Sequence, residues 1–289
     1  MRHSCLALTL LLMPSTMSPP SGYTRGQLIF EDVFSTSSLD TTKWNPWWGQ
    51  DSTGRWNDNG NLPSPYSGAN AGSYDLDYAD PYPSAYSTNT TGNHLVTGGG
   101  GLQEIATPSS FFTSIGYTWA SAALTSYGHW YIPATGGYLQ VRALLPDMSH
   151  GAWPALWLLP GNVGNDGAEF DILDGGVNCT TGACANVTVD SKWFGTGETS
   201  TVNTGVDLTA GYHVYGFQYC PGTSFKVFLD GTLLHTWTSG VSVSANYEVI
   251  ITHEIASDSA SGFHPITSPS FPGPYIYRVN DVQLYSGCH

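Results

Sequence analysis

The sequence has 289 residues, of which 40% are hydrophobic and 13% aromatic, enough to build a sizeable core in one or two domains. It carries 8 Lys and Arg against 22 Asp and Glu, which gives a net charge of −14. An acidic chain without a basic patch argues against nucleic acids, anionic membranes and highly anionic substrates. We therefore expect neither a nucleic acid nor a membrane as a partner.

The first 22 residues predict a secretory signal peptide followed by a short linker. Arg2 gives a positively charged start, Leu6–Met13 is a short apolar run, and a Ser/Pro-rich stretch follows. The apolar run is too short to span a bilayer, and no later segment approaches that length. The alternative is an ordinary N-terminal strand. We expect a secreted, extracellular monomer whose single domain covers residues 23–289.

Residues 45–115 form a long stretch rich in Gly, Ser, Asn and Pro that also holds many Tyr and Trp residues. Disorder is a poor interpretation, because disordered segments contain few aromatic residues. Long aromatic loops on a rigid scaffold usually bind a ligand. Trp47, Trp48 and Trp56 are the candidates for such contacts.

The rest of the chain predicts short β-strands bounded by Gly, Pro, Asn or Asp, with no helix-period segment longer than about two turns. The expected strands cover residues 137–146, 152–160, 185–194, 212–219, 225–237, 247–255 and 275–285. Residues 225–237 read as two strands joined at Asp230-Gly231, a strong hairpin signal. Many short strands with such turns predict a β-sandwich or jelly roll, and no linker separates a second domain.

The segment GAEFDILDGG, residues 167–176, concentrates three carboxylates in a short apolar strand. Glu169 and Asp171 share a face because they lie two residues apart, whereas Asp174 joins them only if the strand contains a β-bulge. With a bulge, one carboxylate could attack an anomeric carbon, a second could protonate the leaving oxygen, and the middle one could tune the nucleophile. The other interpretation is structural: Asp-Gly-Gly is a turn signal, so Asp174 ends the strand.

Four cysteines follow the apolar N-terminal segment, and an even number in a secreted chain predicts disulfides with three possible pairings. Cys179 and Cys184 flank a short loop that suits a local bridge. Cys220 and Cys288 would then tie the end of the chain to an internal strand. The spacings fit no usual zinc site.

Five ordered blocks of the sequence resemble glycoside hydrolase family 16, the laminarinase-like β-jelly rolls. The blocks are residues 28–44, 117–128, 136–160, 212–237 and 277–286, and the carboxylate strand follows the third. The resemblance implies an all-β jelly-roll sandwich of two antiparallel sheets with a concave substrate cleft. It also implies a retaining endo-hydrolase of β-1,3 or mixed β-1,3/1,4 glucan, with no cofactor required for the chemistry.

The catalytic residues carry over from this resemblance one by one. Glu169 matches the nucleophile and Asp171 the middle residue that holds it, while Asp174 falls where the family has its acid/base Glu. Because Asp is one methylene shorter than Glu, a carbohydrate-binding relative that has lost its acid stays open as an alternative. A transglycosylase also stays open, and so does a hydrolase of another β-linked polysaccharide such as a galactan, because loops decide the subsites.

The resemblance also predicts substrate-binding residues. Trp153 and Trp157 share a strand face and would stack on sugar rings, and Trp193 lies on the next strand beyond the carboxylates. His253 and Glu254 belong to a strand expected to cross the concave face. Because neighbours on a strand point to opposite sides, one of the two should lie in the cleft and the other behind it.

A structural calcium is the one metal that the resemblance suggests. Asp281 matches an Asp of the closing strand that helps to bind calcium on the convex side of laminarinase-like members. Glu31, in the opening strand, would add a backbone oxygen, and loop oxygens would have to supply the other ligands.

Overall fold

The computed structural model describes residues 17–36, 38–45, 49–50, 56–57, 77–79, 94–96, 101–108, 119–160, 169–175, 179, 184–193, 196–238, 245–255 and 273–289. Only the backbone is described at residues 49–50, 56–57, 77–79, 94–95, 186–193 and 196–199. Residues 1–16 of the predicted signal peptide, and Trp47 and Trp48 of the aromatic loop, lie outside these ranges. Trp56 is placed by its backbone alone.

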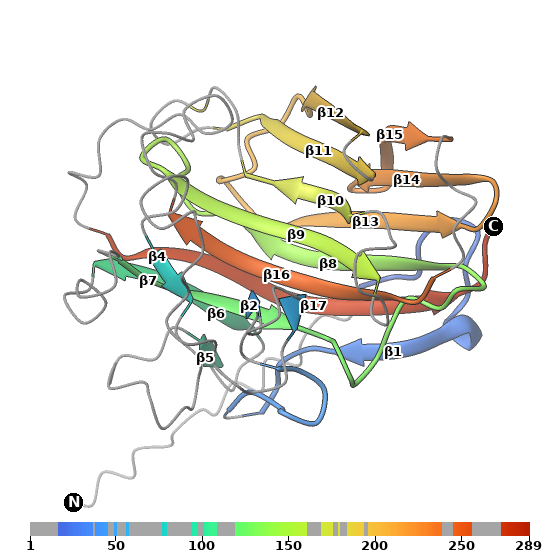
Figure 1. Cartoon of the computed structure of the whole chain (residues 1–289), viewed down its shortest axis with the longest axis horizontal. Coiled ribbons are helices and arrows are strands. Elements are labelled where there is room, and N and C mark those ends of the chain that lie inside the picture. Colours follow the sequence, from blue (N-terminus) through green and yellow to red (C-terminus); the bar gives the residue numbers. More distant parts are fainter. Residues whose placement is uncertain are drawn as a thin grey trace, which may run out of the picture.

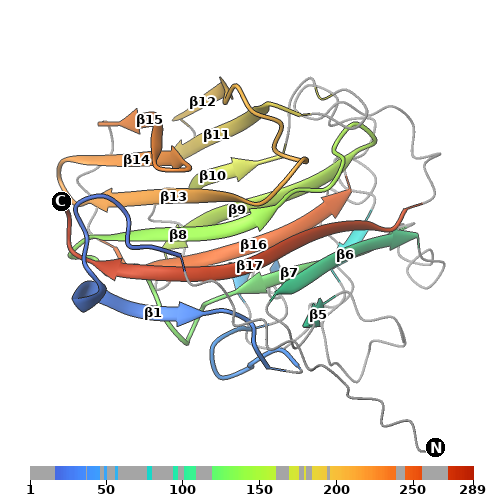
Figure 2. The same cartoon turned by 180° about the vertical axis from the view of Figure 1, so that it is seen from behind.

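The described strands form two antiparallel layers that are joined along one edge (Figures 1 and 2). The front layer, nearest the viewer in Figure 1, runs in the order β12 (Thr196–Asn203), β11 (Asn186–Trp193), β10 (Glu169–Asp174), β9 (Ala152–Pro160), β16 (Tyr247–Ile255) and β7 (Trp119–Thr125). The back layer, nearest the viewer in Figure 2, runs β6 (Leu102–Pro108), β17 (Tyr275–Ser286), β8 (Gly137–Leu144), β13 (His213–Cys220), β14 (Ser224–Leu229) and β15 (Thr232–Trp237).

The smaller elements lie at the edges of these layers. β1 (Leu28–Asp32) pairs with β17, β5 (His94–Val96) with β6, and β4 (Asp77–Ala79) runs parallel to β7. β2 (Gly49–Gln50) and β3 (Trp56–Asn57) pair with each other. Within the described part of the chain, the one helical element is the 3₁₀ turn η1 (Arg25–Gln27), so no helix there could cross a membrane.

The predicted all-β sandwich is confirmed, with one addition. The expected strands match β8, β9, β11, β13, β14, β15, β16 and β17 to within two residues at each end. The two layers, however, belong to one continuous sheet, because Thr107 of β6 pairs with Ala120 of β7 and carries the hydrogen-bond ladder across the edge. The sequence pattern predicts each strand separately, so it does not reveal that β6 and β7 pair and connect the two layers.

The core lies between the layers and follows from alternation along each strand. On β8, Leu139 and Val141 are buried in the core, while Tyr138 and Gln140 lie on the outer face of the back layer. Across the sandwich, the ring of Phe170 from β10 stacks on Phe225 of β14 with centroids 3.8 Å apart. The apolar half of the carboxylate strand therefore anchors it to the core, which leaves its acidic half on the opposite face.

Residues 17–22, which we call the N-terminal strap, belong to the folded domain. The backbone N–H of Met17 donates to Asp281 of β17 at 3.0 Å, and the carbonyl of Ser18 accepts from Gln140 Nε2 at 3.0 Å. Met17 itself is buried. The Ser/Pro-rich stretch resembles a linker in composition, but in the structure its backbone is bound to the back layer.

Both predicted disulfides are confirmed. Cys179 pairs with Cys184, with Cα atoms 4.5 Å apart, and Cys220 pairs with Cys288 at 5.3 Å. The first bridge closes a separation of 5 residues and the second a separation of 68, from the end of β13 to the residues after β17.

Removing the two bridges should have unequal effects on stability. Under the loop-entropy model, replacing both Cys220 and Cys288 by Ser should lower the free energy of unfolding by about 4 kcal/mol. The same change at Cys179 and Cys184 should cost only about 2 kcal/mol. Urea unfolding of the two double variants checks this. Equal losses, or a larger loss at the short loop, would contradict the expectation.

Candidate active site

A β-bulge in β10 brings the three carboxylates of the carboxylate strand to one face. Asp171 lies opposite Trp157 of β9, but Leu173 lies opposite Leu156, so β10 uses one residue more than its partner between these pairs. Asp174 consequently lies opposite Ala155, two residues from Trp157 on β9, and shares its face. Without the bulge, Asp174 would point into the core. We call this side of the front layer the carboxylate face.

Trp153 holds the carboxylate at the end of this strand. Its indole Nε1 donates to Oδ1 of Asp174 at 2.6 Å, and the backbone N–H of Gly175 donates to the carbonyl of Pro154 at 2.9 Å. Asp174 is 8% exposed and Asp171 4% exposed, whereas Glu169 is half-buried. The pair of Trp153 and Trp157 thus lies on the carboxylate face, and Trp153 donates a hydrogen bond directly to Asp174.

The next strand, β16, extends the carboxylate face. Its register puts Ile250 opposite Trp157, Thr252 opposite Ala155 and Glu254 opposite Trp153. Trp157 Nε1 lies 3.4 Å from the hydroxyl of Thr252. Glu254 is half-buried and lies beside Trp153. Thr252 was not predicted, because a Thr in an apolar strand carries no distinguishing sequence signal.

His253 does not belong to this face. It is fully buried between the layers, and its ring Nδ1 lies 2.8 Å from the backbone oxygen of Glu104 in β6. Of the His253–Glu254 pair, the histidine is therefore the member that lies behind the sheet. This removes His253 from the predicted substrate-binding set, because no sugar can reach it.

Burial makes His253 a source of acid sensitivity. Desolvation lowers the pKa of its imidazole to about 4, against the usual value of 6.5. Between these pH values the unfolded chain binds a proton that the folded chain does not, so the contribution of His253 to stability falls as pH drops from 6.5 to 4. The same burial raises the pKa of the Glu104 carboxyl, which acts in the opposite direction.

The comparison of His253→Gln with the wild type isolates this contribution. The wild type should lose up to about 3 kcal/mol more of its unfolding free energy than the variant between pH 7 and pH 4. Urea unfolding at pH 7, 5.5 and 4 measures the difference. If the two stability curves run parallel over this range, His253 is not the titrating group.

Trp193 is placed by its backbone only. It ends β11, whose register puts Lys192 opposite Glu169 and Asp190 opposite Asp171. The strand that carries Trp193 therefore lies beside the carboxylate strand, as the sequence predicted. Lys192 and Asp190 were not singled out from the sequence, because only the pairing of the two strands relates them to Glu169 and Asp171.

The two candidate calcium ligands lie on the back layer, where two cations contact Glu31. The Glu31 backbone oxygen accepts from Lys43 Nζ at 3.2 Å, and its carboxylate pairs with Arg25 at 3.1 Å. Asp281 is fully buried; one carboxylate oxygen accepts the N–H of Met17, and the other has no hydrogen-bond partner among the described residues. Ca²⁺ needs about six to eight oxygen ligands, and cations already stand against Glu31. Among the described residues, no group of three or more His, Cys, Asp or Glu could hold a metal.

We therefore expect the folded chain to be insensitive to chelation. EDTA should leave the melting temperature unchanged to within about 1 °C, and excess CaCl₂ should not raise it. A calcium bound at a hundred times its Kd would contribute about 2.7 kcal/mol, or roughly 5–10 °C for a domain of this size. A calcium-dependent shift of that order in differential scanning calorimetry would restore the calcium site.

Several solved structures share this fold. No family model matches the sequence. The laminarinase of Rhodothermus marinus superposes with a TM-score of 0.66 at 20% identity, covering 91% of this chain and 98% of that one. SCLam, a non-specific endo-β-1,3(4)-glucanase from family GH16, gives a TM-score of 0.67 at 15% identity over 96% of this chain and 98% of its own. The chain has the laminarinase fold.

A stretch that covers 35% of this chain is also similar in sequence to two proteins of Rhizobium meliloti. An endo-1,3-1,4-β-glycanase of Rhizobium meliloti is 36% identical over 101 residues, which is 35% of this chain and 20% of that protein. A second one from the same organism is 32% identical over 104 residues. The match thus spans about a fifth of these relatives. The resemblance of the sequence to laminarinase-like jelly rolls is confirmed at the level of the fold.

Proposed function

We propose that the chain is a secreted family 16 glycoside hydrolase that cleaves β-1,3 or mixed β-1,3/1,4 glucan internally, with retention of configuration. The observation that carries this proposal is the bulge in β10, which puts Glu169, Asp171 and Asp174 on one face. Trp153, bonded to Asp174, adds an aromatic surface beside them. The names of the similar proteins support a glucan as the substrate.

Each residue has a distinct part in the proposed mechanism. Glu169 attacks the anomeric carbon and forms a covalent glycosyl ester, while Asp174 gives its proton to the departing glycosidic oxygen. Asp171, buried between them on the same face, orients the Glu169 carboxylate. In the second step Asp174 takes a proton from water, which attacks the ester and releases Glu169. Trp153, Trp157 and Glu254 bind the sugar chain, and no cofactor is required.

The same site supports a second candidate function. The carboxyl of Asp174 lies on a side chain one methylene shorter than Glu and is held by Trp153 at 2.6 Å. A misplacement of about 1 Å can cost roughly a hundredfold in rate. A carbohydrate-binding relative with little or no turnover would keep this face and lose only the acid step. A transglycosylase would keep both steps and pass the sugar to another chain.

The proposed setting is extracellular and monomeric, with a polysaccharide as the partner. Two disulfides support an oxidising compartment. Edman sequencing or intact mass of the secreted protein would locate the processed N-terminus. Because the strap contacts β17 and β8, we expect this terminus at or before Met17.

Reducing-sugar release tests the function. The purified chain should release oligosaccharides from laminarin or lichenan and much less from agarose and xyloglucan, with product lengths that show internal cleavage. Binding to laminarin without release supports the carbohydrate-binding relative. Longer products than the starting oligosaccharide support the transglycosylase, and release from agarose alone would move the substrate to a galactan.

A further inference from the structure

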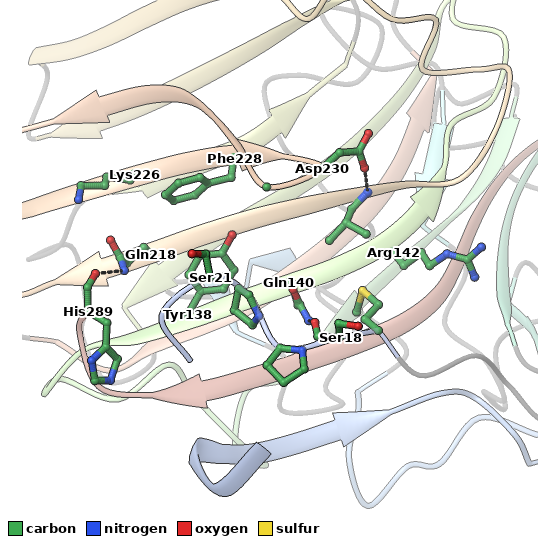
Figure 3. Close-up of a pocket in the computed structure, with 15 residues that line it drawn as sticks. Ser18, Ser21, Tyr138, Gln140, Arg142, Gln218, Lys226, Phe228, Asp230 and His289 are labelled. Atoms are coloured by element: carbon green, nitrogen blue, oxygen red, sulfur yellow. Dashed lines mark hydrogen bonds between the residues drawn. The ribbon is translucent and has the colours of Figure 1, made fainter. Parts of the chain in front are cut away.

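The outer face of the back layer carries a groove that the proposed catalysis does not use. It has a volume of about 830 Å³ and lies between the N-terminal strap and strands β8, β13 and β14. Figure 3 shows Lys226, Phe228 and Asp230 along one side of it and Ser18 and Ser21 of the strap on the other. The whole core separates this back-layer groove from the carboxylate face. Its volume falls within the range of roughly 300–1,000 Å³ that is usual for ligand sites.

A glycine in β13 creates the floor of the groove. Gly216 lies on the outer face between Val214 and Gln218, and a Cβ at this position would collide with the hydroxyl and ring of Tyr138. The Tyr138 ring therefore lies across the strand. Burial raises its pKa, so the phenol stays neutral. The ring centroid of Phe228 is 5.5 Å from that of Tyr138. The two rings are tilted by 41° to each other, and Phe228 is the more exposed of the two.

The polar lining is close to neutral and rich in hydrogen-bonding groups. The Asp230 carboxylate already accepts from the Val214 backbone and from His213, and Arg142 donates to Asn280. Lys226 has no hydrogen-bond or ion-pair partner among the residues that the structure describes. One available ammonium, two serines and glutamine carbonyls suit a neutral polyhydroxylated ligand better than a polyanion, which a net charge of −14 would repel.

We propose that the back-layer groove is a second, non-catalytic carbohydrate-binding site. It would hold a short stretch of a neutral glycan, with the Phe228 ring against the C–H face of a sugar and Lys226 bound to its hydroxyls. The choice of β-glucan as that glycan rests on the proposed function. A site on the opposite side of the sandwich would hold the enzyme on a polysaccharide surface while another chain passes through the carboxylate face.

A fluorine signal at Phe228 gives a readout that does not depend on catalysis. The probe is laminarihexaose, added to the full chain carrying Glu169→Gln and 4-fluorophenylalanine, with the Phe228 resonance assigned by Phe228→Leu. The Phe228 signal should shift saturably with laminarihexaose up to about 10 mM, ten times the ~1 mM Kd of a weak site. A polyethylene glycol of similar length should leave it unchanged.

Two variants and a control complete the test. Lys226→Ala should weaken the fluorine-detected affinity about ten-fold, because a hydrogen bond to a charged group is lost. Phe228→Ala should reduce retardation of the chain in native gels that contain laminarin. Leu233→Ala, which truncates a side chain that is 51% exposed on the neighbouring β15, should change neither measurement.

The outcomes separate this inference from the proposed function. If the wild-type chain hydrolyses laminarin but the Phe228 resonance stays silent, the groove is not a sugar site and the proposed enzyme stands. If the Phe228 resonance shifts saturably but the wild-type chain hydrolyses no glucan, the groove stands and the proposed enzyme does not. A shift that Lys226→Ala leaves unaltered, or that polyethylene glycol also causes, counts against the proposal.

Discussion

Replacing Glu169 by Gln is expected to abolish glucan hydrolysis, with a loss of at least about 10⁴-fold in kcat, and to leave laminarin binding within a few-fold of the wild type. An amide has nearly the shape of the carboxylate but cannot attack the anomeric carbon. Glu169 is half-buried at the start of β10, so the change should leave the core of the domain intact. Initial rates on laminarin, together with affinity electrophoresis, measure both effects.

Chemical rescue makes the role of Glu169 specific. In Glu169→Ala, added azide should restore turnover of an aryl β-glucoside and give the glycosyl azide of inverted configuration, because the small anion replaces the missing nucleophile. Asp40→Asn, a carboxylate-to-amide change at an exposed turn after β1, is the control and should behave as the wild type. Full activity of Glu169→Gln would remove Glu169 from the mechanism.

Changes at Asp174 should move the rate in both directions. Asp174→Glu restores the missing methylene and should raise kcat on β-1,3-glucan by about ten-fold or more, since about 1 Å of reach is at stake. Asp174→Asn should lower the rate on the natural glucan by about 10² or more, because the leaving oxygen then receives no proton. An aryl glycoside with a good leaving group needs little protonation and should be much less affected.

The contact with Trp153 adds a second way to test Asp174. Trp153→Phe keeps an aromatic ring but removes the donor that lies 2.6 Å from the carboxylate, so it should lower kcat more on glucan than on the aryl glycoside. If Asp174 only ends the strand, all of these variants will change thermal stability and none will change the ratio of the two rates. Equal ratios across the set would therefore remove the acid/base role.

Much of this arrangement could be predicted from local sequence. The strands of residues 137–144, 152–160 and 247–255 alternate or are continuously apolar between turn residues, so their positions could be predicted to within a residue or two. The hairpin at Asp230-Gly231 could be predicted from one dipeptide, and Asp230 indeed has a positive φ of 48° there.

The face of Asp174 could not be fixed in the same way. A bulge adds a single residue to a strand. A regular strand and a bulged strand of the same sequence therefore place Asp174 on opposite faces. The pairing with β9, in which Leu173 rather than Ile172 lies opposite Leu156, decides between them. The sequence likewise does not show which of His253 and Glu254 lies on the carboxylate face. In the structure, Glu254 lies opposite Trp153 and so shares its face.

The strap and the back-layer groove escaped prediction for a different reason. A Ser/Pro-rich stretch has the composition of a linker, and only the long-range bonds from Met17 to Asp281 and from Gln140 to Ser18 bind it to the domain. Likewise, the glycine at 216 is unremarkable in the sequence. It acquires a role only because Tyr138 on the neighbouring strand lies across it.

Trapping the covalent intermediate is the most direct test of the central claim, that Glu169 is the nucleophile of a retaining β-glucanase. An activated 2-deoxy-2-fluoro-β-laminaribioside has a good leaving group, so its reaction does not depend on the reach of Asp174. Mass spectrometry of the peptic digest should find one laminaribiosyl adduct, on the peptide that contains Glu169, and none in Glu169→Gln. An adduct on another residue, or hydrolysis of laminarin with inversion and no adduct, would contradict the account.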